Sequence, residues 1–302
     1  ALLIWSADRF VIGAVGLARN LNISPLVIGV VIIGFGTSAP ELLISGVSAW
    51  QGNSGLAIGN AVGSIITNIA LILGVTALLT PILVARQTLL REFPLLFVAM
   101  GLAWFLLRDS VLSLSDACIL LAALIIVIGY LSTTSVNIEH EDDDQYCSIA
   151  MSLLWTILGL VLLLISSNIL VTSSVKLAQL FGISDLVIGL TIVAIGTSLP
   201  ELAASVTGAL KHHTDLAIGN VLGSNIFNTL GVISVPGFIN AYTIPGDVLT
   251  RDFPIMVGLT LFLLAVAYFT HKGRGMYRVS GILFLLCFIS YQVILYIQSV
   301  PS

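Results

Sequence analysis

The chain carries the same polar strings twice, and the distance between the two copies never changes. GTSAPEL at position 36 returns as GTSLPEL at 196, LAIGNAVGS at 56 as LAIGNVLGS at 216, REFP at 91 as RDFP at 251, and SPLVIG at 24 as SDLVIG at 184. The offset is 160 in all four cases (196 − 36, 216 − 56, 251 − 91 and 184 − 24). Self-similarity at a fixed offset is the signature of a repeat architecture, so the sequence indicates an internal duplication.

Apolar segments follow one another from end to end. Hydrophobic residues make up 58% of the chain and charged residues 9%, whereas an average soluble protein is roughly 25% charged. A run of about 20 apolar residues spans the hydrocarbon core of a bilayer. We therefore expect an all-α membrane protein with ten transmembrane helices, near 1–20, 24–50, 55–82, 90–107, 112–132, 150–180, 184–210, 215–240, 252–270 and 279–298.

Each copy of the repeat holds about half of these segments, an odd number of spans. An odd number makes the second copy enter the membrane in the opposite sense, which is the inverted-repeat design of many secondary transporters. We expect a first transmembrane repeat at 1–135, an acidic linker at 136–148 and a second, inverted repeat at 149–302. The linker contains EHEDDD, which lacks the glycine and spacing of a calcium loop and is typical of a solvated acidic run.

Lysine and arginine predict the orientation, because they concentrate on the cytoplasmic side. The connections after odd-numbered spans carry Arg19, Arg86, Arg91, Lys211, Lys272, Arg274 and Arg278, against Arg108, Lys176, Arg251 and Arg9 on the other side. We expect a multi-pass protein of the cell membrane with a cytoplasmic linker and both termini extracytoplasmic. Because the chain begins inside an apolar stretch, we also expect residues to precede it.

Several function classes find no support in the composition. There is no basic stripe of the kind that binds nucleic acid. Cys118, Cys147 and Cys287 show no CxxC spacing and are typical of packing residues or a spare thiol. We expect no resident cofactor. The lipid bilayer is the expected surroundings of the chain, and no protein partner is evident from the sequence.

Two glutamates lie deep within apolar segments, Glu41 and Glu201. A carboxylate at the bilayer centre costs on the order of 2.5–3.5 kcal/mol even on permissive insertion scales. No Lys, Arg or His lies in mid-span to compensate, so bound cations or protons are the natural partners. A protonated glutamate that bonds across helices is the alternative, and the equivalent positions in both copies favour cations.

The residues before each glutamate predict a broken helix. Pro40 and Pro200 remove a backbone donor and clash with the carbonyl one turn back. Irregular backbone at membrane depth is tolerated where it is buried or lines a hydrated cavity. An ordinary kinked helix also contains Ser, Thr and Pro, but two copies with a glutamate each favour a site. The expected oxygens are carbonyls near Gly34, Ala194, Thr37 and Thr197, and hydroxyls of Thr37, Ser38, Thr197 and Ser198.

The next segment of each copy carries a polar stripe. Its residues are spaced four apart and so share one helix face: Asn60, Ser64 and Asn68, repeated as Asn220, Ser224 and Asn228. Asn60 and Asn220 fit interhelical hydrogen bonding as well as they fit ligation. The other four are expected to face the glutamates. Such a set of carboxylate, amide, hydroxyl and carbonyl oxygens, without sulfur or imidazole, suits Ca2+, and Na+ can use the same oxygens.

These strings resemble the two alpha repeats of the cation/Ca2+ exchanger superfamily, in its prokaryotic Na+/Ca2+ exchanger branch. The resemblance implies a calcium/sodium antiporter working by alternating access, and no enzyme. It implies four clustered cation sites: Glu41 and Glu201 as shared ligands, backbone oxygens of Thr37 and Thr197 on Ca2+, Ser38, Ser64, Ser198 and Ser224 with the Gly34 and Ala194 carbonyls at flanking Na+ sites, and Asn68 and Asn228 at the middle site.

Two departures from relatives narrow these expectations. The proton-coupled branch typically has a second acidic residue after the GN pair, where this chain has Ala61 and Val221. Na+ coupling is therefore favoured, while a Ca2+/H+ exchanger or an antiporter of another hard divalent cation remains the alternative. Several relatives, including K+-dependent ones, have Asp where this chain has Asn228, so no K+ requirement is expected. The stoichiometry that the family suggests, three Na+ per Ca2+, implies electrogenic Ca2+ extrusion.

Two other classes fit less well. An intramembrane serine protease needs a histidine beside its serine, and all four histidines fall in connections. Cation channels commonly obtain their symmetry by assembling subunits, whereas this duplication encloses one site in one chain. Spans 1 and 6 lack the repeated strings, and their polar residues Asp8 and Asn168 fall outside the predicted site. We expect these two spans to be the moving element.

Overall fold

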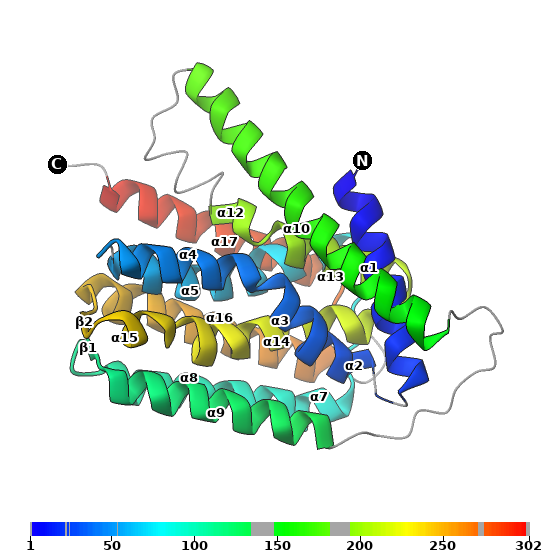
Figure 1. Cartoon of the computed structure of the whole chain (residues 1–302), viewed down its shortest axis with the longest axis horizontal. Coiled ribbons are helices and arrows are strands. Elements are labelled where there is room, and N and C mark those ends of the chain that lie inside the picture. Colours follow the sequence, from blue (N-terminus) through cyan, green and yellow to red (C-terminus); the bar gives the residue numbers. More distant parts are fainter. Residues whose placement is uncertain are drawn as a thin grey trace.

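The computed structural model is a bundle of helices (Figure 1) and describes residues 2–21, 23, 25–52, 54–133, 148–181, 194–270 and 275–299. The linker and Cys147 lie outside these ranges, while Cys118 and Cys287 are free thiols. The elements, with π-helical turns written η, are α1 (Leu2–Asn20), α2 (Pro25–Ile28), η1 (Gly29–Ile33), α3 (Gly34–Thr37), α4 (Ala39–Trp50), α5 (Ser54–Thr67), η2 (Asn68–Ile72), α6 (Leu73–Leu79), α7 (Arg86–Leu90), α8 (Glu92–Leu107), β1 (Val111–Leu112), α9 (Leu114–Thr133), α10 (Ile149–Leu180), α12 (Ala194–Thr197), α13 (Leu199–Leu210), α14 (Thr214–Phe227), η4 (Asn228–Val232), α15 (Val235–Ile239), β2 (Tyr242–Thr243), η5 (Val248–Asp252), α16 (Phe253–Thr270) and α17 (Arg278–Ser299).

The predicted count of ten spans is not reached within the described ranges. Helix α1 carries Asp8, Arg9 and Arg19 along its 19 residues, and the start of the predicted span 184–210 lies outside them. An eighth candidate joins Gly29–Thr37 to Ala39–Trp50 through a 45° bend. Within the part of the chain that the structure describes, seven segments are long and apolar enough to cross a membrane: Gly55–Leu79, Arg86–Leu107, Leu114–Leu131, Ile149–Ser174, Thr214–Ile239, Val248–Thr270 and Arg278–Gln298.

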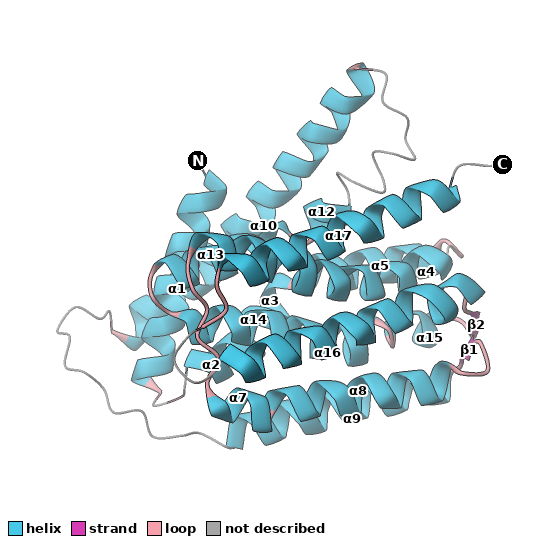
Figure 2. Ribbon diagram, turned by 180° about the vertical axis from the view of Figure 1, so that it is seen from behind, coloured by secondary structure: helices cyan, strands magenta, loops and turns pink. Residues whose placement is uncertain are grey.

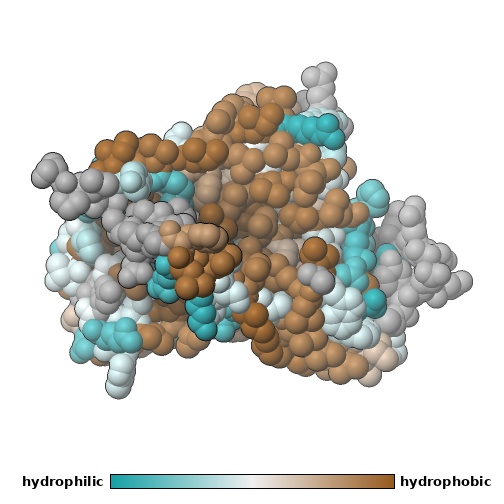
Figure 3. Space-filling view, turned by 90° about the horizontal axis from the view of Figure 1, so that it is seen from above, coloured by the Kyte–Doolittle hydropathy of each residue, from teal (hydrophilic) through white to brown (hydrophobic). Residues whose placement is uncertain are grey.

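The outer surface is largely apolar. Figure 3 shows hydrophobic residues spread over much of one face. Large apolar side chains such as Trp104, Ile126, Phe269 and Val279 are more than half exposed. A water-soluble monomer rarely exposes contiguous apolar surface on this scale. The surface is typical of a protein whose side chains face lipid.

The duplication in sequence is also a duplication in local structure. Helix α4 and helix α13 begin and end at residues separated by the same offset of 160, and each starts one residue after a break, at Ser38 and Ser198. Three further pairs show the same correspondence: α3 with α12, α5 with α14, and η2 with η4. The repeated strings therefore fold alike in both copies.

The two spans that carry the polar stripes form the centre of the bundle. The apolar window of Thr214–Ile239 is 100% buried and that of Gly55–Leu79 is 72% buried, against 22% for Leu114–Leu131. Figures 1 and 2 show α5 and α14 inside the bundle, with α8, α9, α16 and α17 along its outside. The stripes thus lie where the protein is most completely shielded from lipid.

Helices α1 and α10 pack tightly against each other and cross the rest of the bundle obliquely (Figure 1). A methyl group added at Gly13 would collide with the backbone of Thr156, and one at Gly159 would lie 2.5 Å from the Phe10 nitrogen. Small residues allow this backbone-to-backbone approach in membrane helices. The Ser6 and Ser166 hydroxyls, equivalent under the 160 offset, lie 3.5 Å apart where the helices meet.

Glycines also bring the segment before the first glutamate onto α14. A methyl group added at Gly223 would lie 2.5 Å from both Cα and the carbonyl oxygen of Val30, and one at Gly34 would lie 2.8 Å from the Ser224 nitrogen. The equivalent approach in the other half involves residues 184–193, which lie outside the described ranges. In the half that is described, a chain segment of the first repeat lies directly on the backbone of the second.

Short β contacts join the two repeats at the bundle ends. Strand β1 pairs antiparallel with β2, which links the α8–α9 connection to the chain after α15. An isolated bridge pairs Ile82, after α6, with Met276, before α17. Each contact connects the chain that follows a central span of one repeat to the loop between the last two helices of the other.

Replacing Gly223 with alanine should lower stability, because the added methyl group meets backbone atoms that cannot rotate away. Overpacking of this kind costs about 1–3 kcal/mol. Thermal unfolding of the purified protein in detergent measures the effect. Gly101→Ala is the matched control, since Gly101 is exposed on α8 and an added methyl group has no atom within 4 Å. Equal melting temperatures for the two variants would contradict the close approach.

Candidate cation site

Glu41 and Glu201 each sit in the first turn of a helix that begins at the centre of the bundle. The helix breaks at Ser38 and at Ser198, and Pro40 and Pro200 fall within the first two positions of the following helix. Proline is tolerated there because the first helical N–H groups have no intrahelical partner. The positive end of each helix dipole lies beside its glutamate and favours the charged carboxylate.

Both carboxylates are almost completely buried, at 1% exposure for Glu41 and 0% for Glu201. Among the described residues, neither forms an ion pair with Lys, Arg or His. The two glutamates lie in one region of the bundle, because Ser38, three residues before Glu41, donates to Glu201 Oε1. Each has one oxygen, Oε2, without a hydrogen-bond partner in the described structure. A bound cation would compensate two buried carboxyl groups in this state, and so would protonation.

Serine hydroxyls form hydrogen bonds around the glutamates, and two of these bonds join the repeats. Ser38 of the first repeat donates to Glu201 Oε1 over 3.2 Å, and Ser224 of the second donates to the Gly34 carbonyl over 3.3 Å. Ser64 donates to Glu41 Oε1 within its own repeat, over 3.5 Å. Gly34 also accepts the Ser38 N–H, so its carbonyl is occupied and not free as expected. It would have to give up the Ser224 bond to hold a cation.

The remaining predicted ligands surround this pair. Thr37 donates its hydroxyl to the Ile33 carbonyl over 2.9 Å, which leaves its backbone oxygen as the predicted ligand. Thr197 and Ala194 end and begin the equivalent turn α12. Asn68 and Asn228 are the first residues of η2 and η4 and are 1% and 0% exposed. All predicted ligands whose side chains are described thus belong to four chain segments that meet at the bundle centre.

Oxygen atoms without partners are concentrated here. Within the described chain, five of the buried side-chain oxygens that accept or donate no hydrogen bond belong to the predicted ligands: Glu41 Oε2, Glu201 Oε2, Ser198 Oγ, Asn68 Oδ1 and Asn228 Oδ1. A buried polar atom left unpaired costs about 1–3 kcal/mol. Hard cations such as Ca2+ coordinate 6–8 oxygens of this type. The donor set therefore fits such a cation as cargo.

Asn60 and Asn220 act as connectors between helices. Asn220 Nδ2 donates to the Glu201 backbone carbonyl over 3.2 Å and to Ser205 Oγ over 2.8 Å. Asn60 makes the same two bonds, to the Glu41 carbonyl and to Ser45, over 3.1 and 3.3 Å. Of the two interpretations that the sequence left open, interhelical bonding is the one found. These bonds hold each glutamate-bearing turn against the neighbouring span.

Three polar residues near the centre escaped the sequence analysis. Ser45 and Ser205 obey the 160 offset, so a search of the repeat for matched hydroxyls would have found them. Asn225 does not, since the equivalent residue is Ile65. Asn225 is 0% exposed and accepts a hydrogen bond from Asn68 Nδ2 over 3.0 Å. A search for residues repeated at the 160 offset misses Asn225, because only the second repeat has a polar residue at this position.

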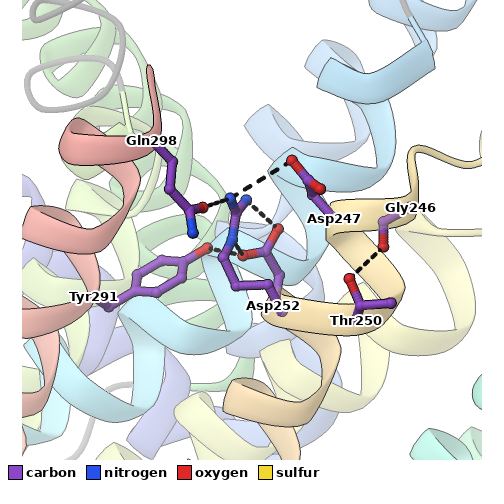
Figure 4. Close-up of polar contacts among 7 residues, drawn as sticks. Gly246, Asp247, Thr250, Asp252, Tyr291 and Gln298 are labelled. Carbon is purple, nitrogen blue, oxygen red and sulfur yellow. Dashed lines mark hydrogen bonds and ion pairs between the residues drawn. The ribbon is translucent and has the colours of Figure 1, made fainter. Parts of the chain in front are cut away.

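Two further buried carboxylates were not predicted from the sequence. Glu92 and Asp252, from the REFP and RDFP strings, are 0% and 5% exposed. Arg251 forms a two-pronged ion pair with Asp252, with Nε–Oδ1 and Nη2–Oδ2 distances of 2.7 and 2.9 Å. The Tyr291 hydroxyl donates to Asp252 Oδ1 over 3.1 Å (Figure 4). Arg91 lies 3.6 Å from Glu92. Each of these acids has an adjacent arginine within ion-pair distance, which distinguishes them from Glu41 and Glu201.

Comparison with known protein families identifies the family of this chain. The family described as sodium/calcium exchanger protein matches residues 1–133 and 151–297. The chain belongs to the sodium/calcium exchanger protein family. As a family member it is a multi-pass membrane transporter that exchanges cations, Ca2+ among them, and not an enzyme.

Individual relatives of this exchanger extend over nearly its whole length. The putative antiporter CaxA of Alkalimonas amylolytica is 46% identical over 98% of this chain and 95% of its own. The sodium/calcium exchanger MaX1 of Methanosarcina acetivorans is 28% identical over 97% of this chain and 95% of its own. A solved structure of the sodium-calcium exchanger NCX_Mj, soaked with Na+ and Ca2+, is 32% identical, covers 100% of this chain and 95% of its own, and has a TM-score of 0.83. The exchanger thus shares the NCX_Mj fold.

Replacing Asn220 with leucine should destabilise the exchanger, because the Glu201 carbonyl and the Ser205 hydroxyl each lose a buried partner. A loss of about 1–3 kcal/mol per unpaired group is expected. Thermal unfolding in detergent measures it, with Thr250→Val as the control, since Thr250 bonds Gly246 on an exposed turn. Asn60→Leu should lower the melting temperature less, because Asn60 is only partly buried. A larger fall in melting temperature for Asn60→Leu than for Asn220→Leu would contradict the structural role given to Asn220.

Proposed function

We propose that this exchanger is a secondary antiporter that moves Ca2+ against Na+ by alternating access, through a site formed by both repeats. The ligands are the twelve residues predicted from the sequence, with Glu41 and Glu201 shared between the ions. The observation that carries the proposal is the pair of buried glutamates, one from each repeat, without a basic partner among the described residues. Two carboxylates neutralise one Ca2+, and the same oxygens suit Na+, so the ions compete and cross in turn.

An asymmetry at the centre supports alternating access. Ser38 donates to the glutamate of the other repeat, whereas the equivalent Ser198 hydroxyl has no partner in the described structure. Two copies of one sequence pattern thus hold different contacts around the same site. In inverted-repeat transporters the binding site stays between the repeats while access alternates. We propose that the two copies exchange these contacts during the cycle.

The pair α1 and α10 is proposed as the moving element. Leu160 of α10 is the side chain that an added methyl group at Gly36 would meet, and Val171 is the one it would meet at Gly196. Ser167 donates to the Gly196 carbonyl over 3.3 Å. Helix α10 therefore contacts both broken turns, which is closer to the site than the sequence suggested. If ion release changes the conformation of either turn, that change acts directly on α10.

The finer properties form part of the same proposal. Two inverted repeats of five spans, at 1–135 and 149–302, would flank a cytoplasmic linker in the cell membrane, with both termini extracytoplasmic. Exchange of three Na+ for one Ca2+ would move one net charge, in the direction of Ca2+ extrusion driven by Na+ entry. Asn228, in place of an acidic residue, favours a cycle without K+.

The first test is Ca2+ uptake into proteoliposomes loaded with Na+. Wild-type protein should take up radioactive Ca2+ only while an outward Na+ gradient exists. Glu41→Gln and Glu201→Gln should each abolish this uptake, because either change removes half of the charge that neutralises Ca2+. Asp247→Asn is the matched control, since that carboxylate is 80% exposed and lies outside the site.

Each alternative has its own signature in that assay. Uptake that ignores Na+ and follows a pH gradient would replace the proposal with Ca2+/H+ exchange. Uptake of another divalent cation in place of Ca2+ would keep the antiporter and change its substrate. Full activity of both glutamine variants would overturn the site.

Membrane voltage should change the rate of uptake. With three Na+ leaving for each Ca2+ entering, one positive charge leaves the vesicle per cycle. A potential that is positive inside should therefore accelerate uptake, with a driving force of about 2.3 kcal/mol per 100 mV. Uptake under imposed potentials of either sign measures this. Equal rates at both signs would indicate two Na+ per Ca2+.

A further inference from the structure

Asn225 is the polar residue at the centre that the duplication does not explain. Its equivalent in the first repeat is Ile65, and both side chains are 0% exposed. Asn225 immediately follows Ser224 on α14. An amide buried at this depth in a membrane protein is costly unless it bonds. The position therefore calls for a role that an isoleucine cannot fill.

The role follows from the bond that Asn225 makes. Asn68 Nδ2 donates to Asn225 Oδ1 over 3.0 Å, which joins the first repeat to the second. A carboxamide has its donor nitrogen and its acceptor oxygen on opposite branches of one plane. Holding the nitrogen of Asn68 against Asn225 therefore turns its oxygen the other way. That oxygen is buried and has no hydrogen-bond partner in the described chain.

The second repeat offers the contrast. Asn228, the counterpart of Asn68, has no hydrogen-bond partner for either amide atom in the described chain. The residue that corresponds to Asn225 for this amide is Ile65, which has no acceptor. Asn68 and Asn228 have the same side chain. In the described chain, however, only the Asn68 amide has its orientation fixed by a side-chain hydrogen bond.

We propose that Asn225 is a positioning residue that fixes the Asn68 amide with its carbonyl oxygen free for the cation, so that the middle site has one preset ligand and one adjustable ligand. The inference rests on the proposed function only in taking Asn68 as a cation ligand. Asn225 acts through Asn68, contributes no ligand atom itself, and gives the duplicated site an asymmetry that the matched motifs lack.

The test is a double-mutant cycle between the two asparagines. Asn225→Leu keeps the side-chain volume and removes the acceptor. The concentration of Ca2+ that gives half-maximal thermal stabilisation of the purified protein should rise about two- to tenfold, the effect of one ordinary hydrogen bond. In the Asn68→Leu background the same change should add no further shift. Ile65→Leu, at the equivalent position of the other repeat, should leave the concentration unchanged.

A second variant keeps the proposal open to refutation if Asn225→Leu does not fold. Asn225→Asp retains an acceptor at the same place, so it should bind Ca2+ at least as tightly as the wild type. Weaker binding by Asn225→Asp would overturn the proposal. An unchanged half-maximal concentration in Asn225→Leu, or an equal shift with and without the Asn68 amide, would overturn it as well.

The binding readout separates this inference from the antiport proposal. A wild-type protein that Ca2+ stabilises but that shows no Na+-driven uptake would reject antiport, and the cycle would still report on Asn225. A protein that exchanges Ca2+ for Na+ but shows no coupling between the two asparagines would reject the positioning role alone. If neither Ca2+ nor Na+ stabilises the protein, both ideas fall.

Discussion

Two carboxyl groups buried inside an apolar bundle, one from each repeat, are the constraint to which the rest of the molecule responds. Glu41 and Glu201 lie in the first turns of helices that start at the bundle centre, so each helix dipole favours the charge beside it. Serine hydroxyls bond one oxygen of each carboxylate. Neither measure supplies a full positive charge. In the proposed function, a permanent Lys or Arg would neutralise the pair and occupy the place of the cargo, whereas a mobile cation neutralises it and can leave.

Glu92 and Asp252, the buried acids of the REFP and RDFP strings, differ from the two central glutamates because each lies beside an arginine. Asp252 is bonded by both the Arg251 fork and the Tyr291 hydroxyl, from two helices (Figure 4). Its charge is neutralised within the protein, and its bond with Tyr291 joins η5 to α17. Both acids belong to repeated strings, which means that repetition alone does not separate a transport site from a structural ion pair. The presence or absence of an adjacent arginine does.

Much of the site was predictable, because polar residues are expensive in apolar segments and their duplication is easy to see. Proline predicted the breaks at Ser38 and Ser198, and the i, i+4, i+8 spacing predicted the buried stripes. The π-helical turns at Asn68 and Asn228 were not foreseen, since one extra residue in a turn leaves no mark in hydrophobic periodicity. Asn225 was missed because it has no copy. The burial of Glu92 and Asp252 was missed because an adjacent arginine suggested a membrane surface.

The β contacts at the bundle ends have a consequence for how such a machine moves. Strand β1 is bound to β2, and Ile82 is bridged to Met276, so each repeat holds the other by its backbone at a bundle end. A rigid-body rotation of one repeat against the other would break these backbone hydrogen bonds. Helices α1 and α10 come from different repeats and are packed together through their glycines. In the proposed movement of α1 with α10, the moving unit combines one helix from each repeat and so differs from the unit that was duplicated.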